Sequence, residues 1–226
     1  MYWILFIGIA IASYLVQANL KRKFKNYSQI HLSNGMTGRE VAIQMLHDNG
    51  IYDVQVVSTS GMLTDHYNPA NKTVNLSEGV YNSCSVAAAA VAAHECGHAV
   101  QHATAYAPLR LRTALVPAVN FSSSILSWIL LIGILTIQSF PQIMLVGIVL
   151  FAVTTLFSFV TLPVEINASM RAVAWLDRAR ITDYSNHDAA RSALRSAAYT
   201  YVVAALSSLA TLLYYVMMFL GGSNDD

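Results

Sequence analysis

The chain carries no charged residue between Thr113 and Val164, and this stretch restricts its fold more than any other feature. A helix needs about 20 predominantly apolar residues to cross a bilayer, so the stretch is too long for a single span. A polar, proline-containing run at 138–142 divides it into two parts. The sequence therefore predicts a hairpin of two membrane helices, at about 115–137 and 143–163.

Two further apolar segments lie near the ends of the sequence, at about 2–16 and 197–220. The first has no Lys or Arg before it, and a basic cluster at 21–25 follows it directly. A cleaved signal peptide has the opposite order of charge, so we expect a retained membrane anchor. Hydrophobic residues form 55% of the chain and charged residues 11%, which agrees with four spans rather than with an ordinary soluble domain.

The 13 Lys and Arg residues all fall in two segments, 21–112 and 171–195. Because basic segments beside membrane spans stay in the cytoplasm, we expect both segments there and both termini outside. The reducing cytosol also suits Cys84 and Cys96, which are too few for a disulfide framework. A net charge of +1 gives no indication of a nucleic-acid partner.

An H-E-x-x-H run, from His94 to His98, lies late in an alanine-rich stretch that we expect to be a helix at about 83–105. Residues i and i+4 share one face of a helix, so both imidazoles can reach a single metal ion. Glu95 stands between them and is placed to take a proton from metal-bound water. The pattern favours a zinc hydrolase over an amphipathic helix that happens to carry two histidines.

Zinc in a catalytic site needs a third protein ligand, with the fourth position left for water. His102 is disfavoured, because it lies about 12 Å from His94 along a straight helix. Glu165 is favoured, since it is the first charge after the apolar stretch and Pro163 just before it suits the first turn of a helix. The alternatives are Asp65, His66 and His187.

Cys96 lies inside the motif, and thiolates bind zinc well. It is two residues from His94, about 200° around the helix, and therefore faces the packed side. We interpret it as a buried structural thiol rather than a ligand.

Capping signals predict the helix boundaries before the motif. Thr37 and Glu40 resemble a capping box that opens a helix to about residue 48, and Asn49-Gly50 ends it. Ser77 or Asn82 is expected to cap the approach to the motif helix.

Short strands are expected at 53–57 and 73–76, with a turn at 67–71. The second strand directly precedes the motif region. We therefore expect its edge to be available for pairing with an extended substrate.

Several stretches spread over nearly the whole chain carry a resemblance to a known family. They are LTDHYNP at 63–69, TVNLS at 73–77, VYN at 80–82, AAHECGHAVQH at 92–102, LPVEINASMRA at 162–172 and AAYTYV at 197–202. In these stretches and their order the chain resembles the YugP-type neutral zinc metallopeptidases of bacterial membranes. This resemblance implies a zinc peptidase of the bacterial plasma membrane.

The same family is similar in layout to the HtpX-like membrane proteases, in which a Glu-x-x-x-Asp pair follows the spans. There the Glu binds zinc and the Asp supports the site, so the resemblance implies that Glu165 is the third ligand. The fifth position of the pair is Ser169 here, not Asp. Ser169 or Asn167 is then the candidate to orient a ligand, and His102 is expected beside the site.

The expected function is a membrane-embedded, zinc-dependent endopeptidase that acts at the cytoplasmic membrane surface and holds one Zn²⁺ per chain. Glu95 is the expected general base, and His94, His98 and Glu165 are the expected ligands. Its partners would be a protein or peptide substrate and the lipid bilayer, with no nucleic acid. Candidates for the donor that stabilises the oxyanion are His66, Tyr67 and His187.

The expected fold class is a mainly α membrane protein, with four transmembrane helices and a small cytoplasmic α+β zincin-like metallopeptidase region. The expected order is an N-terminal anchor (1–18), the zincin-like region (19–113), the transmembrane hairpin (114–164), a cytoplasmic helical segment that carries the third ligand (165–196), a C-terminal transmembrane helix (197–220) and a tail (221–226).

Three other functions compete with this interpretation. An intramembrane-cleaving protease would need the motif helix inside the bilayer, but that helix is only mildly apolar. A metal-binding or transport protein would normally carry ionisable residues within its spans, and these spans carry none. A scaffold that has lost catalysis would not need to keep Glu95.

Overall fold

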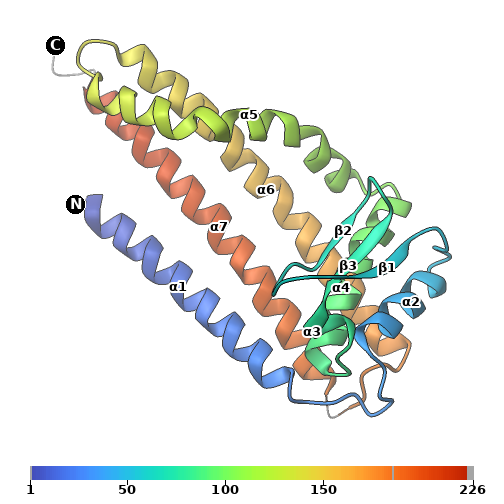
Figure 1. Cartoon of the computed structure of the whole chain (residues 1–226). Helices are drawn as coiled ribbons and strands as arrows, with labels where there is room; N and C mark the ends of the chain where they lie inside the picture. The colour runs from blue at the N-terminus through green and yellow to red at the C-terminus, as the bar shows by residue number, and fades with distance from the viewer. Residues whose placement is uncertain (1, 185, 223–226) are drawn as a thin grey trace. The chain divides into compact units, whose positions relative to one another are not determined.

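The computed structural model describes residues 2–184 and 186–222 (Figure 1). It contains four helices that are long and apolar enough to cross a membrane, as expected. They are α1 (Tyr2–Tyr27), α5 (Ala107–Leu135), α6 (Pro141–Arg178) and α7 (His187–Gly222). Residues 223–226 of the predicted tail lie outside the described residues.

Helix α6 runs through Pro163 without a break. The expectation that Pro163 starts a helix is therefore wrong, although Glu165 does lie on a helix. A proline inside a helix removes one backbone hydrogen bond, and apolar membrane helices tolerate this loss. The apolar residues before Pro163 and the mixed residues after it thus belong to one continuous helix.

The described residues form two compact units, which divide after Leu109, Pro163 and Thr200. The first unit contains α1, the sheet, the shorter helices, the part of α6 after Pro163 and the start of α7. The second unit contains α5 from Arg110 onward and the remaining parts of α6 and α7. In the second unit a hydrogen bond of 2.8 Å joins the hydroxyl groups of Thr155 and Ser208.

The first unit contains a three-stranded sheet in the order β1-β3-β2. Strand β1 (Gln55–Thr59) pairs in parallel with β3 (Thr73–Ser77), and β2 (His66–Asn68) pairs with β3 in the antiparallel sense. Because β3 is the central strand, both of its edges are occupied. The expectation that β3 offers an edge to a substrate is therefore wrong, and the edge strands are β1 and β2.

Strand β2 replaces part of the predicted turn at 67–71. Asn68 pairs with Thr73, so the chain reverses later than predicted, between these two residues. Lys72 takes the left-handed conformation, with φ of 52°, and this closes the reversal. The chain does turn in this region as predicted, but the first residues of the predicted turn, 67 and 68, belong to strand β2.

Helix α2 (Gly38–Asp48) confirms the predicted capping box. The Thr37 side chain accepts a hydrogen bond from the Glu40 backbone N–H, and the Glu40 carboxylate accepts one from the Thr37 backbone N–H. Gly50 after the helix has φ of +71°, the left-handed conformation predicted for it.

A short helix, α3 (Glu78–Tyr81), separates the sheet from the motif helix α4 (Val86–Ala103). The cap of α4 is Ser85, whose hydroxyl group accepts a hydrogen bond from the Ala88 backbone N–H. The prediction of Ser77 or Asn82 as its cap is wrong, because both residues flank α3 instead.

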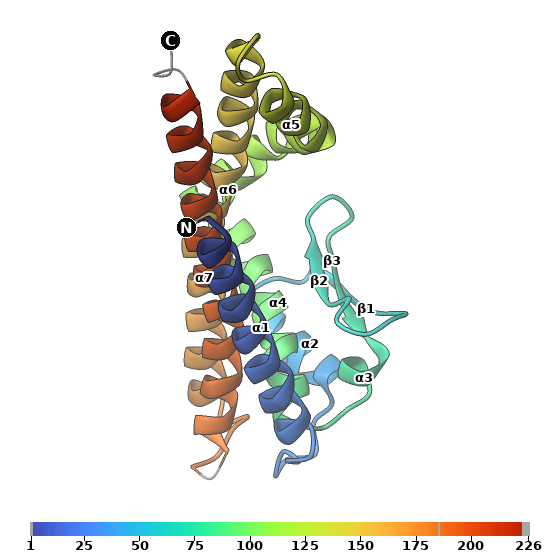
Figure 2. The same ribbon diagram turned by 90° about the vertical axis from the view of Figure 1, so that its left-hand side faces the viewer.

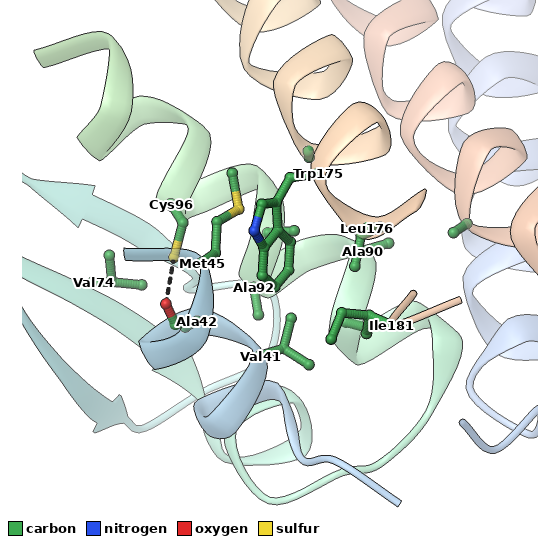
Figure 3. Close-up of a cluster of buried hydrophobic side chains, with 14 of the residues drawn as sticks. Val41, Ala42, Met45, Val74, Ala90, Ala92, Cys96, Trp175, Leu176 and Ile181 are labelled. Atoms are coloured by element: carbon green, nitrogen blue, oxygen red, sulfur yellow. Dashed lines mark hydrogen bonds between the residues drawn. The ribbon is translucent and has the colours of Figure 1, made fainter. Parts of the chain in front are cut away.

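The core of the first unit lies where α4 packs against α2 and the part of α6 after Pro163 (Figure 3). Cys96 of α4 is fully buried there beside Met45 of α2, and its thiol donates to the Ala42 carbonyl oxygen. Trp175 of α6 is also buried, and its indole N–H donates to the Asp48 carboxylate. In Figure 2 the sheet lies to the right of α4, and α1 passes in front of α4.

Helices α4 and α6 touch backbone to backbone at Gly97. A Cβ atom at this position would lie 2.7 Å from the Ala168 carbonyl oxygen, which is too close for any side chain. The glycine inside the motif therefore allows the approach of α6, and with it the approach of Glu165.

Candidate metal centre

Helix α4 presents His94 and His98 on one face, as their spacing requires. The centroids of the two imidazole rings lie 4.8 Å apart, and the ring planes are nearly perpendicular. Both side chains are largely buried, with exposed fractions of 13% and 11%. The two rings thus converge on one small volume beside α6.

Glu165 of α6 completes this group. Its Oε2 atom lies 3.2 Å from His94 Nε2 and 3.6 Å from His98 Nε2. Among the described residues, these three form a group whose possible ligand atoms all lie within 4.8 Å of one another. The sequence reached Glu165 from its position after the apolar stretch, and α6 brings it to the motif.

The donor set fits zinc in kind and in spacing. Two imidazole nitrogens and one carboxylate oxygen are donors that catalytic zinc uses, with one position left open. Ligands at about 2.05 Å in a tetrahedral arrangement lie about 3.3 Å from one another. The two distances from Glu165 to the histidines are close to this value.

Burial and the neighbouring histidines have opposite effects on the pKa of Glu165. Burial alone would raise the pKa of its carboxyl group, but the hydrogen bonds from His94 and His98 outweigh burial and hold that pKa well below its ordinary value. Burial lowers the pKa of His98, whereas the contacts with Glu165 raise it, and the net shift is upward. A metal ion would take the place of these contacts between the carboxylate and the two imidazoles.

The second nitrogen of His94 has its own partner. Its Nδ1 atom lies 3.1 Å from the Ser169 hydroxyl oxygen. Ser169 occupies the position where the resemblance implies an aspartate, and it contacts the histidine from there. The hydroxyl group can accept the Nδ1 proton and leave Nε2 free to bind a metal.

Gln101 plays the corresponding part for His98. Its Oε1 atom lies 3.1 Å from His98 Nδ1, and its side chain is fully buried. The Gln101 amide N–H₂ donates to the Val164 carbonyl oxygen at 2.7 Å and to Asn167 Oδ1 at 3.1 Å. With both donors used, Oε1 is left to accept, so His98 donates from Nδ1 and keeps Nε2 for a metal.

Arg171 fixes the far end of this chain of hydrogen bonds. Its Nε–H donates to Asn167 Oδ1 at 2.7 Å, and a guanidinium can only donate. The orientation of Asn167 is thereby set, and with it the orientation of Gln101. Asn167 was expected to orient a ligand directly, but it contacts Gln101 instead.

Sequence reasoning missed Gln101 and Arg171. The available signal was spacing, since Gln101 follows His98 by three residues and so lies on the same face of α4. A glutamine on an otherwise apolar helix face needs a partner, and the second nitrogen of a metal-binding histidine is one. Arg171 lay within the stretch that carried the resemblance, but nothing in the sequence paired it with Asn167.

Glu95 is buried beside strand β2, with an exposed fraction of 9%. Its Oε2 atom accepts a hydrogen bond of 3.1 Å from the Tyr67 backbone N–H. This bond attaches the edge strand to the motif helix. The backbone of β2 therefore faces the carboxylate of the expected general base.

The other expected site residues lie outside the three-residue group. His102 Nδ1 lies 3.0 Å from the Tyr67 hydroxyl oxygen, which places it beside β2. Asp65 accepts hydrogen bonds from the Ser77 backbone N–H and hydroxyl group, and so ties the loop before β2 to the end of β3. His66 and His187 have their contacts elsewhere, with the Thr64 carbonyl oxygen and with Asp177 and Thr182 respectively.

Cys96 is fully buried in the hydrophobic core, on the opposite side of α4 from the histidines. Burial raises the pKa of its thiol well above the ordinary value. The interpretation of Cys96 as a structural thiol agrees with this position.

Comparisons with known proteins agree over the length of the chain. The family model described as "Putative neutral zinc metallopeptidase" matches residues 2–220. The chain is also similar to a protein of Bacillus subtilis (strain 168) described as "Putative membrane protease YugP". The two are 42% identical over 226 residues, which cover 98% of this chain and 100% of the relative. No solved structure matches the chain.

Replacement of Gln101 by Ala should weaken zinc binding by about 10- to 100-fold, the usual effect of losing the group that orients a ligand histidine. Competition of the purified protein with a zinc-chelating dye measures this affinity. Thr104→Ala is the matched control, since the Thr104 hydroxyl group donates to backbone oxygens of its own helix. Unchanged zinc affinity in a folded Gln101→Ala variant would refute the assigned role.

Glu165→Ala should weaken zinc binding by more than about 100-fold and remove activity, because a ligand is lost and not merely a group that orients one. His102→Ala should leave zinc occupancy largely intact, since His102 contacts Tyr67. Metal content after dialysis, measured by mass spectrometry, separates the two. A reversal of the two results would show that this ligand set is wrong.

Proposed function

The chain belongs to the neutral zinc metallopeptidase family, and we propose that it is a zinc-dependent endopeptidase of a bacterial plasma membrane. The observation that carries the proposal is the convergence of His94, His98 and Glu165 beside the buried Glu95. The family match and the similarity to a described membrane protease support the same reaction class.

We propose that His94, His98 and Glu165 hold one zinc ion per chain. Zinc supplies two things when bound in such a site: it polarises a peptide carbonyl group and lowers the pKa of a water molecule. Ser169 and Gln101 keep the two imidazoles in the orientation and tautomer that direct Nε2 at the ion.

Glu95 is the proposed general base. Its carboxylate takes a proton from the attacking water and later passes the proton to the leaving amine. The hydrogen bond from the Tyr67 backbone N–H holds one carboxylate oxygen and limits rotation of the side chain. A base held in this way needs little rearrangement at the moment of reaction.

Strand β2 is the proposed substrate-binding edge. It is an edge strand, and its Tyr67 N–H faces the catalytic carboxylate. An extended peptide that lies along this edge would pass beside Glu95, and pairing with main-chain groups other than the Tyr67 N–H, which Glu95 occupies, would provide affinity for varied sequences. Tyr67 and His102 lie at the same edge, and Tyr67 is the proposed oxyanion donor that contacts Glu95, through its backbone N–H.

The proposed topology places both basic segments, and so the catalytic group, on the cytoplasmic side, with both termini outside. The four long apolar helices and the distribution of Lys and Arg support this arrangement. Substrate cleavage would then occur at the cytoplasmic surface of the membrane.

Glu95→Gln should abolish peptide cleavage and retain about one zinc per chain, because the base is not a ligand. His94→Ala and His98→Ala should lose both. Hydrolysis of a casein or peptide-library substrate by the purified full-length protein, together with its metal content, measures these effects.

Glu78→Gln is the matched control, because it makes the same chemical change on an exposed residue of α3. It should retain wild-type turnover. Wild-type turnover by Glu95→Gln would exclude Glu95 as the base, whereas zinc binding without any peptide cleavage by the wild-type protein would favour a metal-binding or transport function.

A single cysteine at Phe140 should react with an impermeant maleimide in intact cells, whereas one at Met62 should react only after the membrane is opened. Both positions are exposed, Phe140 between α5 and α6 and Met62 in the loop after β1. Cys84→Ser provides a background in which the buried Cys96 is the one remaining native thiol. Labelling of Met62→Cys from outside would overturn the proposed topology.

A further inference from the structure

The start of α7 and the end of α1 form a pocket of about 370 Å³ in the first unit. Three basic side chains line it: Lys23 from α1, and Arg191 and Arg195 from α7. Asp188 is the acidic residue of the lining, so the pocket carries an excess of positive charge. Its volume lies within the range of small-ligand sites in proteins.

Two of these cations are held in place by neighbouring side chains. Lys23 Nζ donates to the Ser192 hydroxyl oxygen at 2.8 Å, which joins α1 to α7. Arg195 Nε donates to the Tyr199 hydroxyl oxygen at 3.1 Å, and its guanidinium carbon lies 5.5 Å from the centre of the Tyr199 ring. Lys23 and Arg195 are thus ordered before any ligand arrives, which lowers the entropic cost of binding.

The pocket also lies next to the apolar parts of both helices, at the end of that of α1 and at the start of that of α7. Lys23 follows the apolar part of α1, and Tyr199 stands at the start of the apolar part of α7. Exposed apolar side chains of α1, such as Leu15 and Ile11, lie on the same helix as Lys23. Basic groups beside apolar helices, with an aromatic residue between, match the two halves of a phospholipid.

We propose that this pocket binds the phosphate headgroup of an anionic phospholipid. The inference rests on the membrane placement in the proposed function, but not on its catalytic part. Arg191 and Arg195 pair with the phosphate oxygens, Lys23 adds a third positive charge, and the acyl chains lie along the apolar face of α1. The site selects lipids by charge, because a zwitterionic headgroup brings a cation among three cations.

The experiment compares phosphatidylglycerol with phosphatidylcholine of the same acyl chains, added to the zinc-loaded full-length protein in detergent. Native mass spectrometry counts the bound lipids. One phosphatidylglycerol per chain should bind at least about tenfold more tightly than phosphatidylcholine. The Arg191→Gln/Arg195→Gln variant should lose about 30-fold in this affinity, at a factor of about 5 for each basic residue.

The matched control is Lys21→Gln/Lys25→Gln, which removes the same charge from exposed positions on α1 outside the pocket lining. It should stay within about twofold of wild type. If both variants lost the same affinity for phosphatidylglycerol, the lipid would be attracted to the basic surface in general and not to the pocket, and the proposal would be overturned. The zinc content of both variants shows whether they are folded. Arg195→Lys, which keeps the positive charge, should bind phosphatidylglycerol more tightly than the variant with both arginines replaced.

Two soluble probes distinguish the source of the phosphate. Glycerol 3-phosphate should bind far more weakly than phosphatidylglycerol, because it lacks the acyl chains, and equal affinity would point to a free phosphate ester. Pocket-dependent binding of a polyglutamate peptide without lipid binding would identify an acidic peptide site, and would also overturn the proposal. If the wild-type protein binds the lipid but cleaves no peptide, only the proposed catalysis is refuted. If the protein does not partition into membranes, the membrane placement on which both proposals rest is refuted.

Discussion

The close contact of α4 with α6 at Gly97 is the constraint on which the site depends. Gly97 precedes His98 by one residue, and Ala168, its contact on α6, lies about one turn after Glu165. With the two backbones in contact, a short carboxylate side chain reaches both imidazoles. A larger residue at position 97 would push the helices apart and leave the two histidines without their third partner.

The same contact brings together a buried set of polar side chains that would otherwise be costly. Gln101 is fully buried, yet its amide group has partners on both sides, in His98 and in the backbone and side chain of α6. Arg171 can only donate, so Asn167 accepts from it through its side-chain oxygen. Gln101 therefore donates to Asn167, and its own oxygen accepts from His98. A satisfied network of this kind selects one arrangement of the ring nitrogens over the others.

The sequence predicted those features that depend on short-range spacing. The motif histidines, the capping box at Thr37 and the four long apolar helices all follow from patterns within one helix turn or one apolar run. Glu165 was reached because one charge after a long neutral stretch is conspicuous, and the family resemblance added to that argument.

The features that the sequence did not predict depend on contacts between distant segments. Strand β2 is three residues long, and its strand character comes from pairing with β3 rather than from any alternation of its own. The central place of β3 follows from the parallel pairing of β1, which no local signal reveals. Pro163 lies inside α6 rather than in a first helical turn, because an apolar helix tolerates one missing backbone hydrogen bond.

The convergence of His94 and Glu165 has a consequence for folding. The two residues are separated by 71 positions, and the intervening chain includes all of α5 and more than half of α6. A metal held by both would bind the folded chain and not the unfolded one, because the ligands come together only on folding, so its binding free energy would add to the stability of the fold. The loss of entropy on closing a loop grows only slowly with its length, so the length of the intervening chain would add little to the cost of bringing the ligands together. The ion would then contribute to the stability of the first unit as well as to the reaction.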